Sequence, residues 1–161
     1  MESVHLLDSN GKTLSTRSNA RKYFCLGRRM IYWDDLDMSY FANYAFWNYF
    51  TLPALLLNQE ITWSQVDQST LKAIFPPSIP THSRVQHFHF NEDGLLLQHD
   101  YCADVISRFA QAANVVTEHK KNGQITYPAR RIVTPRTPWG KPMAGPVLID
   151  IQVHQFSLLD H

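Results

Sequence analysis

The sequence predicts an α+β fold: a curved antiparallel meander sheet, or half-barrel, of about seven or eight strands wrapped round one aromatic-rich helix. A helix-length stretch from Asp34 to Leu57 is unusually dense in aromatic rings. The chain after it alternates apolar and polar residues between tight turns, and strands joined in this way pair antiparallel. A doubly wound sheet is excluded because it needs crossover helices. The length of 161 residues fits a single domain over residues 1–161.

The first elements are a hairpin and a short strand. Two alternating runs, from Val4 to Leu7 and from Lys12 to Thr16, flank the turn Ser9-Asn10-Gly11. A third strand is expected from Lys22 to Leu26.

The aromatic segment is expected to form the one long helix. Asp35 or Asp37 can cap its start, where a carboxylate meets the positive end of the helix dipole, and Pro53 should kink or end it. The rings occupy more than one helical face, so a single buried stripe cannot absorb them and some are expected to line a cavity. These rings are Tyr40, Phe41, Tyr44, Phe46, Trp47, Tyr49 and Phe50.

Alternating residues after the helix predict a meander with hairpin turns at Asn91–Gly94 and Lys121–Gly123. Before the last strand, Thr134 to Pro146 is a proline-rich loop that could close over the cavity as a lid. The strands are expected at Glu60–Phe75, Arg84–Phe90, Leu95–Tyr101, Val115–Lys121, Gln124–Val133 and Val147–Phe156.

Hairpin parity predicts which side chains share a face of this sheet. One face carries His87, His89 and Asp100. With a two-residue loop, His87 lies directly across from Asp100, within reach of an ion pair. If the loop has an even number of residues, the other face carries Phe88, Phe90, Leu95, Leu97, His99 and Tyr101.

Histidines are frequent, with eight in the chain. His87 and His89 point to the same side of a strand, which is a metal-binding arrangement that His99, Asp100 or His119 could complete. An alternating strand also exposes such rings to solvent, so we expect surface or hydrogen-bonded histidines, no metal and no cofactor.

A proton-transfer site is a further hypothesis. His99 on the apolar face could move a proton near neutral pH, and Tyr101 could donate to a developing oxyanion. His119 and Asp100 are the other two catalytic candidates. Adjacent strand residues point to opposite faces, so His99 and Asp100 cannot form one dyad without a bulge. The alternative is that His99 and Tyr101 have no catalytic role and only form a hydrogen bond with each other in a core that contains water.

The pair Arg130-Arg131 places one guanidinium inward if the strand is regular. A buried arginine demands a carboxylate partner or an anionic ligand. Asp100, Asp104 and Glu118 are the candidate partners, and an ion pair that pins two strands is favoured over a carboxylate-binding site.

Five motifs follow one another between Asp34 and Val153: YFANYAFWNYFTLP from Tyr40, PTHS from Pro80, DGLL from Asp93, HDY from His99 and PARR from Pro128. In this order they resemble a family of uncharacterised bacterial small proteins, which implies no particular reaction. The chain departs from the family pattern at Ala129, where threonine is expected. A looser, architectural likeness is to the lipoprotein-carrier proteins, whose curved sheet shelters acyl chains and thereby implies an apolar half-barrel interior.

Composition argues against several partners. The net charge of +1 leaves no electrostatic footprint for nucleic acid or an anionic membrane. Asparagines and Pro53 interrupt the aromatic segment, so no membrane span is expected. The amino terminus lacks the pattern of a secretory signal, so we expect a cytoplasmic protein in which Cys25 and Cys102 are buried thiols. Formation of a homo-oligomer stays open.

We expect the protein to bind a small hydrophobic or amphipathic molecule, such as a lipid, in an aromatic-lined half-barrel cavity. Arg130 is the expected anchor for an anionic head group. One rival is a small cyclase, isomerase or lyase that uses the four catalytic candidates in the same cavity. Another is a structural or interaction module without a cavity. The expected cavity residues are Tyr40, Tyr44, Trp47, Phe88, His99 and Tyr101.

Overall fold

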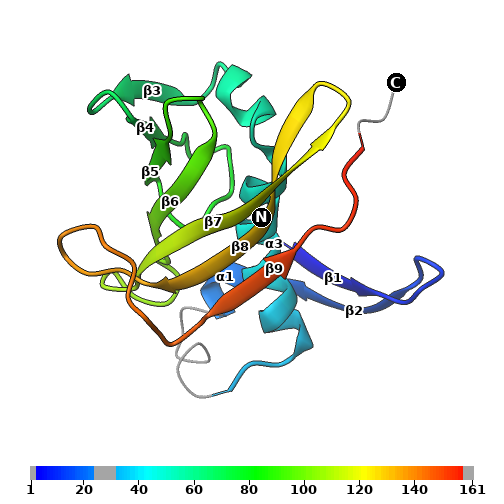
Figure 1. The fold of residues 1–161 in the computed structure, drawn as a ribbon. Coiled ribbons are helices and arrows are strands. Elements are labelled where there is room, and N and C mark those ends of the chain that lie inside the picture. The colour runs from blue at the N-terminus through cyan, green and yellow to red at the C-terminus, as the bar shows by residue number, and fades with distance from the viewer. Residues whose placement is uncertain (1–2, 24–31, 158–161) are drawn as a thin grey trace.

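The protein has an α+β fold, as the sequence predicts: a seven-stranded antiparallel sheet curves past one long helix and stays open, and a two-stranded hairpin forms a second sheet (Figure 1). The computed structural model describes residues 3–23 and 32–157. The helical elements are α1 (Ala20–Tyr23), α3 (Asp35–Thr51) and the short 3-10 helix η2 (Ala54–Leu57). The strands are β1 (Ser3–Leu7), β2 (Thr13–Ser18), β3 (Thr62–Gln65), β4 (Thr70–Ile74), β5 (Val85–Phe90), β6 (Leu96–Cys102), β7 (Gln111–Asn122), β8 (Ile125–Pro135) and β9 (Ile149–Gln152).

The hairpin of β1 and β2 forms as predicted, around a turn that Asp8 organises. The Asp8 carboxylate accepts the backbone N–H groups of Asn10 and Lys12, each at 2.9 Å. The strand expected next is wrong at its start, because Ala20–Tyr23 is helical. The rest of that expected strand, residues 24–26, lies outside the described residues.

Helix α3 begins with a capping box in which Asp34, and neither Asp35 nor Asp37, is the N-cap. The Asp34 carboxylate accepts the backbone N–H of Asp37 at 2.9 Å, and the Asp37 carboxylate accepts that of Asp34 at 3.3 Å. Arg17 of β2 donates to both carboxylates at 2.5 Å, which holds the hairpin against the start of the helix. The helix ends before Pro53, as expected.

The sheet has the order β3-β4-β5-β6-β7-β8-β9, which confirms the predicted meander. The single strand expected at Glu60–Phe75 is two strands, because the chain reverses where the Asp67 carboxylate accepts the N–H of Ser69. Strand β7 is longer than predicted and begins at Gln111, whereas β9 is shorter than the expected Val147–Phe156. The open sheet ends at β3 on one side and at β9 on the other.

The β5–β6 hairpin has the predicted register, with His87 across from Asp100. A bulge next to the turn pairs Phe90 with Leu96 and changes the face of the leucines. Leu96 is therefore 3% exposed and Leu97 is 45% exposed, so the prediction that Leu97 shares the inner face is wrong. We call the face that α3 covers the inner face and the opposite one the outer face.

The loop after β8 lies on the outer face. The Arg136 guanidinium reaches the Asp100 carboxylate at 3.3 Å, and Gln98 donates to the carbonyl of Gly140 at 3.2 Å. Gln98 and Asp100 both point outward from β6. These contacts hold the loop against the outer face and not over the inner face that α3 covers.

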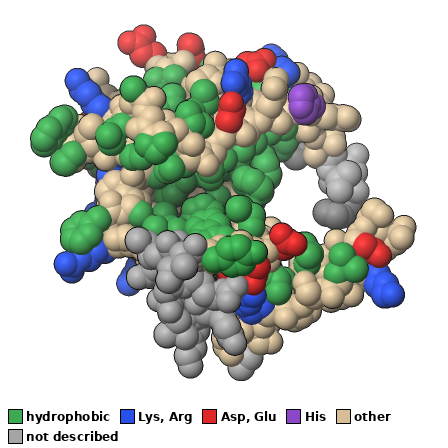
Figure 2. Space-filling view, turned by 90° about the horizontal axis from the view of Figure 1, so that it is seen from below, with side chains coloured by type: hydrophobic (Ala, Val, Ile, Leu, Met, Phe, Trp, Pro, Cys, Tyr) green, Lys and Arg blue, Asp and Glu red, His purple; other side chains and the backbone are tan. Residues whose placement is uncertain are grey.

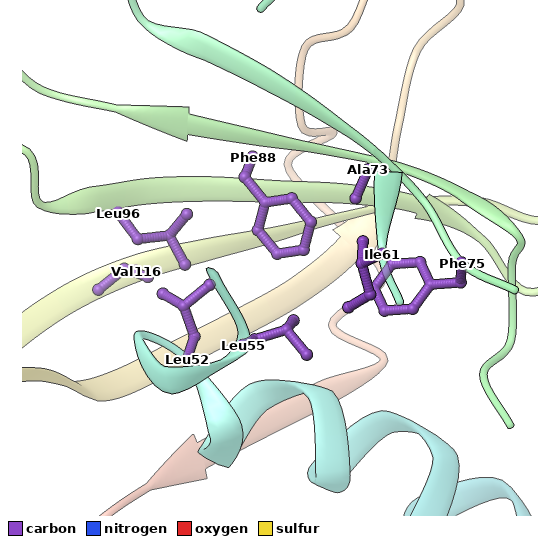
Figure 3. Close-up of a cluster of buried hydrophobic side chains, with 8 residues drawn as sticks. All are labelled: Leu52, Leu55, Ile61, Ala73, Phe75, Phe88, Leu96 and Val116. Carbon is purple, nitrogen blue, oxygen red and sulfur yellow. The ribbon is translucent and has the colours of Figure 1, made fainter. Parts of the chain in front are cut away.

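An apolar cluster fills the space between the sheet and the chain that follows α3 (Figure 3). Phe88 points down from the sheet and Leu52 points up from the chain below it, with Leu96 and Leu55 beside them. Within the described ranges, no helix is both long and apolar enough to cross a bilayer. The whole cluster comprises Leu52, Leu55, Ile61, Ala73, Phe75, Phe88, Leu96 and Val116.

Candidate functional site

A buried hydrogen-bond network centred on Gln86 joins α3 to the inner face of the sheet. The Gln86 side-chain oxygen accepts from the Asn48 amide and from His99 Nε2, each at 2.6 Å. The Gln86 amide nitrogen donates to the Thr81 hydroxyl at 2.7 Å and to the carbonyl of Ser83 at 2.8 Å. Because an amide oxygen can only accept, His99 carries its proton on Nε2.

His99 is held rigidly within this network. Its ring stacks on Phe88, with ring centroids 4.3 Å apart and an interplanar angle of 7°. Burial, followed by the nearby charge of Arg131, lowers the pKa of His99 well below its usual value. The ring is therefore neutral at physiological pH. Its Nε2 proton is donated to the side-chain oxygen of Gln86.

Two tyrosines and an arginine form a second buried polar group beside the network. The hydroxyls of Tyr49 and Tyr101 lie 2.5 Å apart and share one hydrogen bond. Burial raises the pKa of Tyr101 to about 12 and raises that of Tyr49 well above its usual value. Arg131 donates from Nη2 to the Tyr49 carbonyl at 2.9 Å, and its guanidinium carbon lies 5.4 Å from the centre of the Tyr49 ring.

The inward-facing guanidinium belongs to Arg131 and not to Arg130, which had been expected to anchor a head group. Arg130 is exposed and pairs with Asp150 at 2.9 Å. Arg131 is 1% exposed, and within the described chain no carboxylate forms a salt bridge with it. Burial lowers the pKa of Arg131 to about 10, so it remains a cation at neutral pH.

His82 is a buried histidine that packs against the aromatic rings of α3. It was not among the site residues predicted from the sequence. Its Nε2 donates to the carbonyl of Phe41 at 2.9 Å, whereas its Nδ1 is buried without a partner. The ring stacks on Phe41 and Tyr44, with centroids 4.5 and 5.4 Å away. Burial lowers the pKa of His82 to about 4.

A groove of about 320 Å³ runs between α3 and the segment that follows β4. Tyr44 and Trp47 form its aromatic wall, and Trp47 is 38% exposed. The groove is lined by Asn43, Tyr44, Trp47, Asn58, Ser78, Ile79 and Pro80, none of which is charged.

The outer face carries a polar pocket of about 360 Å³ around Asp100. The Asp100 carboxylate accepts from His89 Nε2 at 3.0 Å, from Gln98 at 2.7 Å and from Arg136 at 3.3 Å. His87 is the cross-strand partner of Asp100, as predicted, but the side-chain contact comes from His89. Cys102 also lines this pocket, and burial followed by the neighbouring Asp104 raises its pKa to about 12.

The four catalytic candidates do not converge on one position. His99 and Tyr101 are neighbours on the inner face, with ring centroids 5.1 Å apart. Asp100 lies on the outer face, and His119 donates to the carbonyl of Leu96 at 3.0 Å. Among the residues that the structure describes, no three His, Cys, Asp or Glu side chains are grouped to hold a metal ion.

The six expected cavity residues fall into two groups. Tyr40, Phe88, His99 and Tyr101 are each at most 5% exposed and pack against other rings. Tyr44 and Trp47 line the groove beside α3. The aromatic helix therefore contributes to the interior with one side and to a surface groove with another.

Comparison with protein-family models, with curated proteins and with solved structures found no match to this chain. The resemblance to a bacterial family and the likeness to lipoprotein carriers therefore stay hypotheses. Residues of the motifs nevertheless have defined contacts: Thr81, His82 and Ser83 organise the Gln86 network or the rings of α3.

Proposed function

We propose that the protein binds a small hydrophobic or amphipathic molecule in the groove beside α3. The observation that carries this proposal is an uncharged groove of about 320 Å³ with the partly exposed ring of Trp47 in its wall. Ligand sites in proteins combine apolar and aromatic walls with a few polar groups, and here Asn43, Asn58 and Ser78 supply those groups. An apolar ligand, or the apolar part of an amphipathic one, matches this lining.

The surface also carries apolar side chains that are gathered together. Hydrophobic side chains gather in a recess in the middle of the face seen from below, and most charged side chains lie near its edge (Figure 2). Concentrated apolar surface marks ligand or partner sites more often than scattered apolar residues do. The enzyme alternative has less support, because Asp100 and His119 lie away from the one adjacent pair, His99 and Tyr101. In that pair His99 Nε2 is hydrogen-bonded to Gln86, and the Tyr101 hydroxyl is hydrogen-bonded to Tyr49.

The first test is native mass spectrometry of the purified protein, which should show a retained small molecule. The second is titration with the uncharged fluorophore N-phenylnaphthylamine, whose emission should rise on binding. Trp47→Ala should lose most of this signal, because it removes one wall of the groove. Trp139→Ala is the matched control, since Trp139 is 79% exposed and does not line the groove. Equal binding by both variants would refute the groove as the site.

A further inference from the structure

We propose that Arg131 and the side chains around it form a buried site for a carboxylate group. The proposal goes beyond the groove and does not depend on it. Successive helical residues are rotated by about 100°, so Tyr49, which covers Arg131, and Trp47, which lines the groove, point to different sides of α3. The two sites can therefore be tested separately.

The first argument is charge. Arg131 is 1% exposed, and the fold supplies it with one carbonyl oxygen and the face of one ring, both from Tyr49. Its Nε is buried and makes no hydrogen bond. Buried charges in proteins are paired with an opposite charge, because an isolated one is costly to desolvate. Within the described residues, the anion that this guanidinium requires is not supplied by a side chain.

The second argument is the excess of hydrogen-bond donors around this cation. Asn114 is 0% exposed and its side chain acts on the Tyr49 hydroxyl, lowering the pKa of that phenol, but neither polar atom of its amide has a partner with full hydrogen-bond geometry. It pairs in register with Val133, the next inner-face residue of β8 after Arg131. Tyr49 and Tyr101 share one hydrogen bond, so one phenolic proton is left for a second acceptor, which is either the neighbouring Asn114 amide or a ligand.

The third argument concerns the size and the surroundings of the site. One guanidinium fork matches the two oxygens of a carboxylate, whereas a phosphate would call for more positive charge. Arg131 pairs with Ile151 of β9, so it lies one strand from the open edge of the sheet. The side chains there are apolar: Ile149, Ile151 and Phe46 are partly buried. The carboxylate that we propose is either a free small one or the head group of an apolar chain.

Isothermal titration of the protein with acetate, octanoate and octanol at neutral pH tests the proposal and distinguishes the two sources. Octanoate should bind at least about ten-fold more tightly than octanol, because only octanoate carries the charge. Binding of acetate as well would identify a site for free small carboxylates, whereas binding of octanoate alone would identify a head-group site. Equal affinities for octanoate and octanol, or no binding of either carboxylate, would overturn the proposal.

Adjacent arginines provide matched variants. Arg131→Gln should lower the affinity for the bound carboxylate by about ten-fold or more, while Arg130→Gln, which alters an exposed ion pair, should leave it unchanged. Circular dichroism establishes that each variant is folded. If Arg131→Gln does not fold, Asn114→Leu takes its place and should weaken carboxylate binding several-fold while keeping the cation. An unchanged affinity for the carboxylate in the folded variant would refute the site at Arg131. Octanol binding that depends only on Trp47 would still leave the groove proposal intact.

Discussion

Mild acid should destabilise this protein through its buried histidines. His82 is 3% exposed, and burial lowers its pKa from 6.5 to about 4 in the folded state. Protonation would place a charge among the rings of Phe41 and Tyr44 and give Nδ1 a proton with no acceptor. The unfolded chain has no such cost, so protons favour unfolding between the two pKa values.

The sign and the size follow from these two values. A folded pKa below the unfolded one means that the unfolded state binds more protons between about pH 6.5 and 4, so stability falls as the pH falls through this window. For His82 alone the loss is about 2 kcal/mol at pH 5 and about 3 kcal/mol below pH 4. The pKa of His99 is lowered in the same direction by burial, so its protonation adds to the loss.

Urea denaturation at pH 7.5 and pH 5 measures this effect, with His82→Phe as the reference variant. Phenylalanine keeps a ring against Phe41 and Tyr44 and cannot be protonated. The free energy of unfolding of the wild type should fall by about 2 kcal/mol more than that of the variant on acidification. An equal fall in both proteins would show that His82 is protonated as readily in the folded state as in the unfolded one, and the reasoning would be wrong.

Three further predictions concern single side chains. Arg17→Met should lower the urea midpoint by an amount equivalent to about 1.5–3 kcal/mol, because it removes the donor to Asp37 at the start of α3; an unchanged midpoint would contradict that role. Trp47→Ala should cost about 1 kcal/mol in thermal or urea unfolding, since the ring is 38% exposed, and a cost of about 3–5 kcal/mol would instead indicate a core residue. In a Cys25→Ser background, Cys102 should react with iodoacetamide at pH 8 more slowly than glutathione does, because burial raises its pKa to about 12; a faster reaction would rule out the protonated thiol.

The elements and the central register of the fold could be predicted because turn chemistry and alternation are local signals. The register of His87 across from Asp100 was predicted by assuming a two-residue loop at Asp93-Gly94, and it is confirmed. The same parity gave the wrong face for Leu97, because a bulge inserts one residue beside the turn. The turn at Asp67 was missed because it contains no glycine or proline, the residues that most strongly mark a reversal.

The candidate sites were less predictable, because they depend on contacts between distant elements. The Asn48–Gln86 hydrogen bond joins residues that are 38 positions apart, and neither residue is distinctive in the sequence. The inward arginine had a local signal: Ala129 and Val133 flank Arg131 at two-residue spacing, and all three are buried. Alternation therefore indicates Arg131 and not Arg130 as the inward cation.

The hydrogen bond between Arg131 and the Tyr49 carbonyl also has a consequence during biosynthesis. The two residues are 82 positions apart in the sequence. At about 5–20 residues per second, α3 emerges from the ribosome roughly 4–16 s before the strand that carries Arg131. During this interval the aromatic surface of the nascent helix lacks the sheet that covers it in the folded protein. Such surface is the kind that chaperones recognise, so the demand for chaperone assistance should be greatest between synthesis of α3 and synthesis of β8.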